Sequence, residues 1–458
     1  MELQLSGIPV LNSSTYSKMC ILNDYTVREH AALVRNLKDQ SYEEVFKNKD
    51  NNAVITTVYK KGEEIVTVCR NSTHSEVRVM WEDAKYNSLE PMTKPESVGD
   101  GETTLSQIGV GGYGHCDDDP MIGINYLVKN SDGKAIIYDG GVFEENADDI
   151  YKALVSHNIA KDENGKFIIT AWLFSHAHGD HIGAFIQFAN KYHDVATVEY
   201  FMYNFPGDGK VATREGSFAK FEECIDSYPE AKRVIPRVGQ IYYFGNVKID
   251  ILCSPDMLYT PTRVLPYFND TSFYFMLEAE GVKAMFLGDG GEMCAQKTME
   301  CIKTANLKCD FVQITHHGLY TSNYLTPYTA DEVALLTRDE RYAREAERHI
   351  HKNLTKLYET ADPSVGLWPM GDTLGHPRNG RTTVMRDWSR TYGQVAHFVD
   401  IDSPDSGYDG VNIVRKGDLI TYTMSSEDKL MITKFAFKDG KATLITNQTF
   451  ESFLEENK

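Results

Sequence analysis

The sequence lacks any long apolar run. No stretch approaches the roughly 18 consecutive apolar residues of a membrane-spanning helix, and residues 1–18 lack the basic start and apolar core of a secretory signal. Basic residues are also scarce, since 47 Lys and Arg face 66 Asp and Glu, for a net charge of −19. Such a field repels polyanions, so extensive nucleic-acid binding over a broad basic face is excluded, whereas a local basic groove is still allowed. These absences predict a cytoplasmic chain that does not act at a membrane.

Paired cysteine motifs are absent as well. The chain has eight cysteines, and none forms a C-x-x-C pair. A zinc ribbon and a thioredoxin-type redox site are therefore not indicated. Scattered cysteines in a long chain are typical of a reducing compartment, where most of them are small buried hydrophobic side chains. Apolar residues at 41% and charged residues at 25% are ordinary for a globular protein, which excludes a disordered or fibrous chain.

The N-terminal region has the pattern of a small α+β unit. Residues 27–48 carry apolar side chains at helical spacing. Two alternating runs follow within residues 53–82, and Lys61-Gly62 supplies a turn between strands. We therefore expect a helix-plus-β-hairpin accessory domain over residues 1–95. Its exposed edge strands would suit pairing with a second copy, so a homo-oligomer is an expected partner.

The rest of the chain divides into a long central part and a short C-terminal part. The chain has 458 residues, which at about 150 residues per domain corresponds to two or three domains. Short apolar runs alternate with helical patterns up to about residue 400, as in a layered α/β domain, assigned here to residues 96–400. Residues 331–361 form the longest charged helical pattern. Strand-like alternation returns in residues 401–458, which predicts a β-rich extension.

A dense cluster of metal-binding residue types follows one strand-like run. An apolar run ends at Phe174, and the sequence His176-Ala-His178-Gly-Asp180-His181 follows at once. Imidazole and carboxylate are the ligands that zinc and similar metals take. The cluster lies at the C-terminal end of a predicted strand, where open α/β sheets place their sites. A solvated polar loop would rarely contain so many ionisable side chains, so the sequence predicts a metal or catalytic site here.

Three further segments place a candidate ligand after an apolar strand-like run. Asp139 follows residues 135–138, Asp289 follows residues 284–287, and His316-His317 follow residues 311–315. A single Asp after a strand is more often a cap or a turn residue than a ligand. The recurrence of the same pattern in one predicted domain, together with the histidine cluster, is far more specific.

These motifs resemble those of the metallo-β-lactamase superfamily. The H-x-H-x-D-H cluster is accompanied by Asn269–Ser272, Gly288-Asp289, His316–Gly318 and Gly375–Pro377. This combination is similar to the branch that contains ComEC-like hydrolase domains and teichoic-acid phosphorylcholine esterases. The resemblance covers roughly residues 104–400, about two thirds of the chain, and neither terminal region. It implies an αββα sandwich that holds two metal ions at one edge of its sheets.

The resemblance also implies a ligand set. His176 and His178 would bind the first metal, and Asp180 and His181 would bind the second. Asp289 would bridge both ions. Asp180 is also a candidate catalytic residue. Zinc is the expected metal, with manganese or iron as alternatives, because His/Asp ligand sets accept all three.

The remaining site roles come from the same resemblance. The last ligand should come from the His-His-Gly element, and we favour His317 as the ligand and His316 as the substrate-contacting or proton-donating residue, with the reverse assignment left open. Asp139 would orient the histidine loop. His376 is a further candidate to steady a phosphoryl oxygen or to protonate the leaving group; the alternative is an ordinary loop histidine. Arg378 and Arg381 could bind a phosphate through their guanidinium groups or be ordinary surface charges.

One departure from the family pattern concerns the first metal. Many members supply another histidine between the cluster and the bridging Asp, but the only histidine there is His193, which follows the cluster too closely. Residues 250–256, where that histidine is expected, read DILCSPD. The first metal site is therefore expected to be ligand-poor, filled by water, Asn269 or substrate, or only weakly occupied. His178 stands where flavin-linked di-iron members carry Glu, which disfavours an oxygen-reducing role.

The resulting functional prediction is a metal-dependent hydrolase. Two adjacent cations can hold a hydroxide at neutral pH and stabilise the developing oxyanion. We expect a phosphodiester or another phosphate ester as substrate, carried by a small molecule or a short phosphate-containing chain. Hydrolysis of an amide, lactone or thioester by the same hydroxide is the first alternative, since metals polarise carbonyl and phosphoryl oxygens alike. A catalytically inactive binding or scaffold protein of the same fold is the second alternative.

Overall fold

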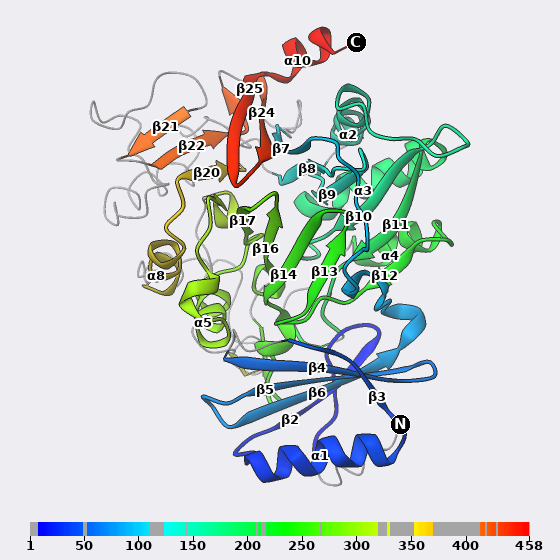
Figure 1. Ribbon diagram of the computed structural model, residues 1–458, viewed down its shortest axis with the longest axis vertical. Coiled ribbons are helices and arrows are strands. Elements are labelled where there is room, and N and C mark those ends of the chain that lie inside the picture. The colour runs from blue at the N-terminus through cyan, green and yellow to red at the C-terminus, as the bar shows by residue number, and fades with distance from the viewer. Residues whose placement is uncertain are drawn as a thin grey trace.

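Figure 1 shows the computed structural model of the chain, coloured from the N-terminus to the C-terminus. The structure describes residues 8–48, 53–109, 123–142, 144–207, 209–211, 217–265, 268–318, 328–329, 352–369, 413–416, 419–426 and 429–457.

The N-terminal unit is a six-stranded antiparallel sheet with one helix on one of its faces (Figure 1). Helix α1 covers Val27–Asp39 and begins with a capping box, in which Thr26 and Glu29 satisfy each other's backbone N–H groups. Leu33 and Leu37 of the helix are buried against the sheet. In chain order the strands are β1 (Leu11–Asn12), β2 (Ser17–Leu22), β3 (Glu43–Lys47), β4 (Val54–Lys61), β5 (Glu64–Asn71) and β6 (Glu76–Asp83).

The helix is shorter than the sequence pattern predicts. The pattern over residues 27–48 predicts one helix, but α1 ends at Asp39, and Ser41 adopts a left-handed φ of 67°. The chain then enters β3, because pairing with β4 decides the structure there. Val45, which continues the helical pattern, is 48% exposed in that strand. The predicted hairpin is confirmed as β4 and β5 with Gly62 in the turn, within a larger sheet than expected.

Two stacked β-sheets form the central part of the chain. The nine-stranded sheet has the order β12-β11-β10-β9-β8-β7-β24-β23, with β25 paired to β24. Its strands are β7 (Thr103–Ile108), β8 (Asn125–Lys129), β9 (Ala135–Asp139), β10 (Phe167–Leu173), β11 (Ala196–Met202), β12 (Lys232–Val234), β23 (Ser425–Ser426), β24 (Lys429–Lys438) and β25 (Lys441–Thr449).

The second sheet has eight strands in the order β13-β14-β16-β17-β18-β20-β22-β21. They are β13 (Ile241–Phe244), β14 (Val247–Cys253), β16 (Tyr274–Ala279), β17 (Val282–Phe286), β18 (Phe311–Gln313), β20 (Val365–Trp368), β21 (Ile413–Lys416) and β22 (Leu419–Thr423). A separate two-stranded pair joins β15 (Arg263–Val264) to β19 (Tyr328–Thr329).

Large aromatic side chains fill the space between the two sheets. Tyr126 and Tyr138 from the nine-stranded sheet meet Phe275 and Phe286 from the other sheet, with ring centroids between 5.0 and 5.3 Å apart. Because side chains alternate along a strand, the outer faces of both sheets are left for helices.

Helices cover both outer faces. Those on the nine-stranded sheet are α2 (Glu144–Ser156), α3 (Gly179–Tyr192), α4 (Phe218–Asp226) and α10 (Phe450–Glu456). Those on the eight-stranded sheet are α5 (Glu292–Cys301) and α8 (Lys352–Ala361). Short 3₁₀ turns are η1 (Ala84–Tyr86), η2 (Glu90–Met92), η3 (His193–Val195), η4 (Pro255–Met257), η5 (Phe268–Thr271), η6 (Thr304–Asn306) and η7 (Thr315–Gly318). The predicted αββα class is confirmed.

Not every sequence-based element can be compared with the structure. The charged helical pattern over residues 331–361 is described only from residue 352, where α8 begins. The domain boundaries near residues 95 and 400 stay predictions. No helix in the described part of the chain is long and apolar enough to cross a membrane.

The C-terminal β-rich region is confirmed, and its strands complete both central sheets. β22 lies parallel to β20 in the eight-stranded sheet, and β24 pairs antiparallel with β7 in the nine-stranded sheet. Ile432 on β24 is the partner of Ile108 on β7, and both side chains are fully buried. The segment that the sequence marks as an extension is therefore an internal part of the sandwich.

The N-terminal sheet is fixed to the central part by buried ionic contacts. Arg237, which follows β12, donates two hydrogen bonds of 2.7 and 2.8 Å to Glu82 on β6, and both side chains are fully buried. Arg237 also donates to Ser17 on β2 and lies 3.6 Å from the Asp256 carboxylate. Arg78 on β6 donates to the backbone carbonyls of η4 and the following turn. A buried charge of this kind is stable only with its partners in place.

A tight turn at the end of β17 requires glycine. Gly288 has a left-handed φ of 51°, and a methyl group there would lie 2.7 Å from Cβ of Ser175 and 3.0 Å from Oγ of Ser272. The side chain of Gln313 holds this turn, because its amide oxygen accepts hydrogen bonds from the N–H groups of Leu287 and Gly288. The next residue is Asp289. The close packing at Gly288 therefore fixes the backbone position from which the Asp289 side chain extends.

We predict that Arg237→Met lowers the free energy of unfolding by about 3–5 kcal/mol, because the carboxylates of Glu82 and Asp256 would stay buried without the guanidinium. Urea denaturation followed by circular dichroism measures the change. Lys232→Gln is the control, since Lys232 and Glu90 form an ion pair whose side chains are 49% and 61% exposed. The control should change stability by less than about 1 kcal/mol. Equal losses in the two variants would contradict the importance of the buried pair.

We predict that Gly288→Ala destabilises the chain more than Gly440→Ala does. Gly440 also has a positive φ, of 73°, but nothing lies within 4 Å of an added methyl group. The left-handed conformation alone costs about 1–2 kcal/mol for alanine, and overpacking at Gly288 adds about 1–3 kcal/mol. Thermal unfolding of both variants measures the difference. Similar unfolding temperatures of the two variants would mean that Ser175 moves away from the added methyl group at little cost, which would contradict the prediction.

Candidate metal centre

The candidate site residues all follow strand ends at one edge of the sandwich. Asp139 is the last residue of β9, and the loop after β10 carries the histidine cluster of residues 176–181. On the other sheet, Asp289 follows β17, and His316 and His317 lie in η7 after β18. Since β9 runs parallel to β10 and β17 runs parallel to β18, their carboxyl ends meet at the same edge.

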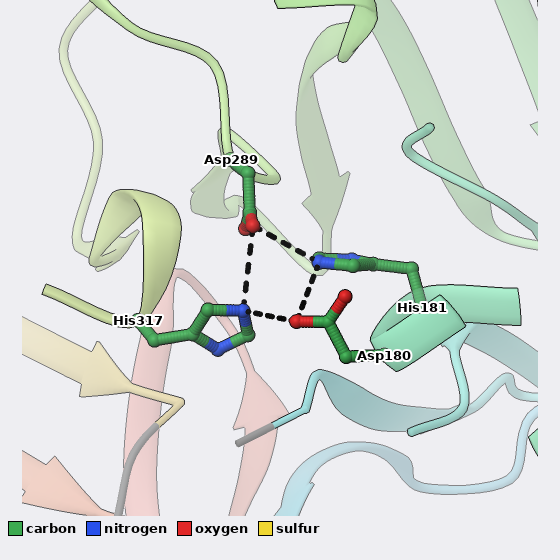
Figure 2. A group of neighbouring side chains, drawn as sticks. All are labelled: Asp180, His181, Asp289 and His317. Atoms are coloured by element: carbon green, nitrogen blue, oxygen red, sulfur yellow. Dashed lines mark ion pairs between the residues drawn. The ribbon is translucent and has the colours of Figure 1, made fainter. Parts of the chain in front are cut away.

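Four of these side chains converge on one point, as Figure 2 shows. They are Asp180, His181, Asp289 and His317, and one possible ligand atom of each lies within 4.8 Å of the others. The His181 and His317 Nε2 atoms lie 3.1 and 3.4 Å from Oδ2 of Asp289. His317 Nε2 is also 3.1 Å from Oδ2 of Asp180. We call these four residues the four-donor group.

A second group shares one member with the first. His176, His178 and Asp289 place one possible ligand atom each within 4.8 Å of one another. His176 Nε2 lies 2.9 Å from Nδ1 of His178 and 3.9 Å from Oδ2 of Asp289. We call these residues the three-donor group. The Asp289 carboxylate therefore stands between two sets of imidazoles.

Buried atoms without partners point into this site. Among the described residues, His181 Nε2, His317 Nε2 and Asp289 Oδ1 are buried and make no contact with hydrogen-bond geometry, although a carboxylate oxygen lies 3.1 Å from each nitrogen. Leaving such an atom unpaired costs about 1–3 kcal/mol or more. Imidazole nitrogens and carboxylate oxygens are the donor set of zinc and related divalent metals. The residues present therefore fit a pair of divalent cations.

The histidine rings are oriented by groups behind them. His181 donates from Nδ1 to Oδ2 of Asp139 at 2.8 Å, and Ser175 donates its N–H and hydroxyl to the same carboxylate. His317 Nδ1 lies 2.9 Å from the carbonyl oxygen of Pro369. These contacts occupy Nδ1 of both rings and turn Nε2 toward the site. Partners of this kind fix the ring orientation of metal-binding histidines.

The site concentrates negative charge away from water. Burial would raise the pKa of Asp289, but the charges of His181 and His317 hold that pKa well below its ordinary value. Against the effect of their own burial, the neighbouring carboxylates raise the pKa of His317 to about 10 and that of His181 well above its ordinary value. Burial and the nearby His181 lower the pKa of His176 well below its ordinary value. Cations are thus strongly favoured beside these carboxylates.

Three residues of the site adopt strained backbone conformations. Asp139, His316 and His317 have φ values of 56°, 50° and 54°, in the left-handed region that non-glycine residues rarely occupy. Such strain costs about 1–3 kcal/mol per residue and persists where surrounding structure enforces it. Here Thr315 anchors η7 by donating its hydroxyl to the carbonyl oxygens of Gly288 and Gly290.

His316 lies beside the two donor groups and is a member of neither. Its Nε2 is 3.8 Å from Oδ2 of Asp289 and 3.0 Å from Nδ2 of Asn269. Its side chain is 21% exposed, whereas that of His317 is 1% exposed. Asn269 in η5 brings its amide next to His316, and its Oδ1 atom is buried with no hydrogen-bond partner among the described residues.

The other sequence-based candidates lie elsewhere. His193 is partly exposed, contacts Asp194 and the Ser227 carbonyl, and belongs to neither donor group. The segment after β14 also contributes to neither group, and its Asp256 accepts a hydrogen bond from Asn204 at 2.6 Å. His376, Arg378 and Arg381 lie outside the described residues. Sequence reasoning did not single out Ser175 or the Pro369 carbonyl, because neither has a pattern that distinguishes it.

Comparisons with known proteins find one family. Residues 119–237 match the family model of the metallo-beta-lactamase superfamily. The matched segment contains the histidine cluster of residues 176–181, whereas Asp289 and His317 lie beyond it. No curated protein matches the chain in sequence.

Similar solved structures share little sequence with this chain. CmlA, a diiron beta-hydroxylase from Streptomyces venezuelae, is 11% identical with a TM-score of 0.34 over 68% of this chain and 53% of its own. Zinc-bound PqqB from Methylobacterium extorquens is 13% identical with a TM-score of 0.30 over 46% and 72%. Tm1679, a metal-dependent hydrolase of the beta-lactamase superfamily, is 12% identical with a TM-score of 0.31 over 63% and 92%.

The chain spans about half the length of CmlA, as matches to two CmlA structures cover 51% and 53% of that protein. Residues 119–237 are thus similar to the metallo-β-lactamase superfamily, and this segment supplies strands β8 to β12 and the histidine loop of the candidate metal centre.

Proposed function

We propose that this protein is a metal-dependent hydrolase that cleaves a phosphodiester or another phosphate ester. The observation that carries the proposal is the position of Asp289, which belongs to both donor groups. A carboxylate shared in this way can hold two cations next to each other. In the proposed site the ligands are His176, His178, Asp180, His181, Asp289 and His317. Zinc is the proposed metal, and manganese and iron suit the same ligands.

The protein's own groups would bind and orient the substrate beside the metals. When bound, two neighbouring divalent cations polarise the bond under attack and supply a nucleophile at neutral pH. Asp139 and Ser175 keep the ring of His181 in place while this happens. His316 and Asn269 lie at the edge of the site, where the His316 side chain is partly exposed. An imidazole and an amide there can contact phosphoryl oxygens.

The groups beside the donor residues suit a phosphate ester. The Asn269 amide and the His316 ring lie against each other, with His316 Nε2 3.8 Å from Oδ2 of the shared carboxylate. The Phe268 ring lies 5.9 Å from that of His178 and offers an apolar contact for the organic part of an ester. The resemblance to phosphoesterase branches of the superfamily points to the same bond. The net charge of −19 favours a small or short substrate over duplex nucleic acid.

We predict that the zinc- or manganese-loaded protein hydrolyses bis(p-nitrophenyl) phosphate and that Asp289→Ala lowers kcat/KM by at least about a hundredfold. The shared carboxylate would be lost from both donor groups at once. Release of nitrophenolate measures the rate, and atomic emission measures bound metal in the same samples. The variant should also bind less metal than the wild type.

Asp194→Ala is the matched control, because the Asp194 side chain is 93% exposed and lies outside both donor groups. It should keep full activity and metal content. Absence of turnover on the phosphodiester by the metal-replete wild type would contradict the bond assignment. Lactones, thioesters and β-lactams would then be tested with the same two variants. Failure on all of them would favour a binding protein of this fold.

The two neighbouring histidines of η7 should respond differently to substitution. We predict that His317→Ala lowers the metal content of the purified protein, because His317 belongs to the four-donor group. His316→Ala should keep the metal content and lower kcat, since His316 lies beside the donors and is partly exposed. His193→Ala on the surface serves as control for both measurements. The opposite pattern would exchange the roles of His316 and His317.

A further inference from the structure

Two loops of the eight-stranded sheet supply half of the four-donor group. The turn after β17 carries Asp289, and η7 carries His317. Helix α5 begins three residues after Asp289, and helix α8 lies beside it (Figure 1). Leu354 and Leu357 of α8 are buried in the same hydrophobic cluster as Met293 of α5. The packing of the two helices therefore places α8 close to the turn that carries Asp289.

The start of α8 is capped by a side chain from α5. Glu292, the first residue of α5, is 1% exposed, and its two carboxylate oxygens accept hydrogen bonds from the N–H groups of Asn353 at 2.8 Å and Leu354 at 3.1 Å. The first N–H groups of a helix have no partner within the helix, and a carboxylate beside them interacts favourably with the helix dipole. Glu292 therefore anchors the N-terminal end of α8 to the start of α5.

The second half of α8 holds η7. The hydroxyl oxygen of Tyr358, a residue that is 5% exposed, accepts a hydrogen bond from the N–H of Thr315 at 3.1 Å. The pairing of β18 with β20 ends at Gln313, so this N–H group lies beyond the strand register. Buried backbone N–H groups need a partner, and Tyr358 supplies one directly before the two histidines of η7.

The turn that Tyr358 holds is strained. Both histidines of η7 have left-handed φ values, and such strain persists only where the surrounding structure enforces it. The Thr315 hydroxyl connects η7 directly to the turn that carries Asp289. Glu292 and Tyr358 connect the same two loops a second time, through α8.

We propose that α8 sets the position of His317 relative to Asp289, with Glu292 and Tyr358 as positioning residues of the metal centre. Neither side chain belongs to a donor group, and each acts through the backbone of a neighbouring element. His317 Nε2 lies 3.4 Å from Oδ2 of Asp289, so a displacement of η7 changes how well both bind one ion. Loss of such support typically weakens metal binding by about 10- to 100-fold. The inference rests on the metal centre of the proposed function and does not depend on which bond is cleaved.

The test is the zinc affinity of the protein, measured by competition with a chromogenic chelator. Tyr358→Phe keeps the ring and removes the acceptor of the Thr315 N–H. We expect it to weaken zinc binding about tenfold, which corresponds to about 1.4 kcal/mol. Glu292→Gln turns an amide N–H₂ group toward one of the two helix N–H donors, so it should weaken zinc binding as well. The visible spectrum of the cobalt-substituted protein should change in both variants, because the geometry around the ion changes.

Each variant has a matched control. Tyr228 is 8% exposed, its hydroxyl has no hydrogen-bond partner among the described residues, and its ring packs near Phe185 of α3. Tyr228→Phe therefore removes a buried hydroxyl that does not contact η7. Glu300→Gln changes a carboxylate in the last turn of α5, where Glu300 pairs with Lys297. Both controls should keep the zinc affinity and the cobalt spectrum of the wild type.

A double variant separates positioning from a general loss of stability. If Tyr358 acts through His317, Tyr358→Phe should weaken zinc binding in the wild type and have no further effect in His317→Ala. Equal losses in the two backgrounds would overturn the proposal. Wild-type zinc affinity and cobalt spectra in both Tyr358→Phe and Glu292→Gln would also overturn it, even if the metal-free variants unfold at lower temperature. Glu292→Gln decides alone if Tyr358→Phe fails to fold.

The same samples distinguish this inference from the proposed function. Zinc binding by the wild type without hydrolysis of the phosphodiester would contradict the bond assignment, while the affinities of the variants would still decide the role of α8. A wild type that binds no zinc would overturn both.

Discussion

The rest of this structure depends on one buried carboxylate, whose negative charge must be compensated. The Asp289 side chain is 2% exposed, and His176, His181, His316 and His317 all place Nε2 within 4 Å of its Oδ2 atom. A carboxylate in such a place is tolerated only when positive charge compensates it. Protons on the imidazoles can supply this charge, and divalent metals can replace those protons. The two sheets, their loops and the strained residues behind them hold these groups together.

The backbone around that carboxylate must also be held rigidly. Asp289 follows a glycine that packs directly on Ser175, and Ser175 in turn donates to Asp139 behind the histidine loop. The turn after β17 and the loop after β10 therefore contact each other through one residue. Backbone strain at His316 and His317 is balanced by the hydrogen bonds of Thr315 and by the Trp368 indole, which donates to the His317 carbonyl at 2.7 Å. The two sheets are thus joined at the point where chemistry is expected.

The structure brings together the ligand candidates that the sequence selects, whereas the residues that support them have no signal in the sequence. Ligand types that follow apolar runs mark residues 176–181 and Asp289, because strand ends and ionisable clusters are both local signals. The pattern over residues 27–48 overestimates α1, because the apolar Val45 continues the helical spacing although strand pairing with β4 decides its structure. The support of His317 by the Pro369 carbonyl has no local signal, since only the folded chain brings the two together. The same holds for Arg237 and Glu82, which are 155 positions apart.

The pairing of β7 with β24 has a consequence for how the chain folds. Leu105 is the partner of Phe435 in this pair. The central strand β7 therefore gains one of its two neighbouring strands only from a segment more than 300 positions later in the chain. Contacts between distant segments slow folding and leave strand edges exposed in the meantime. During synthesis, the nine-stranded sheet stays incomplete until β24 has left the ribosome. The N-terminal sheet has its own helix and hydrophobic cluster and is available to fold earlier, as a platform on which the later strands assemble.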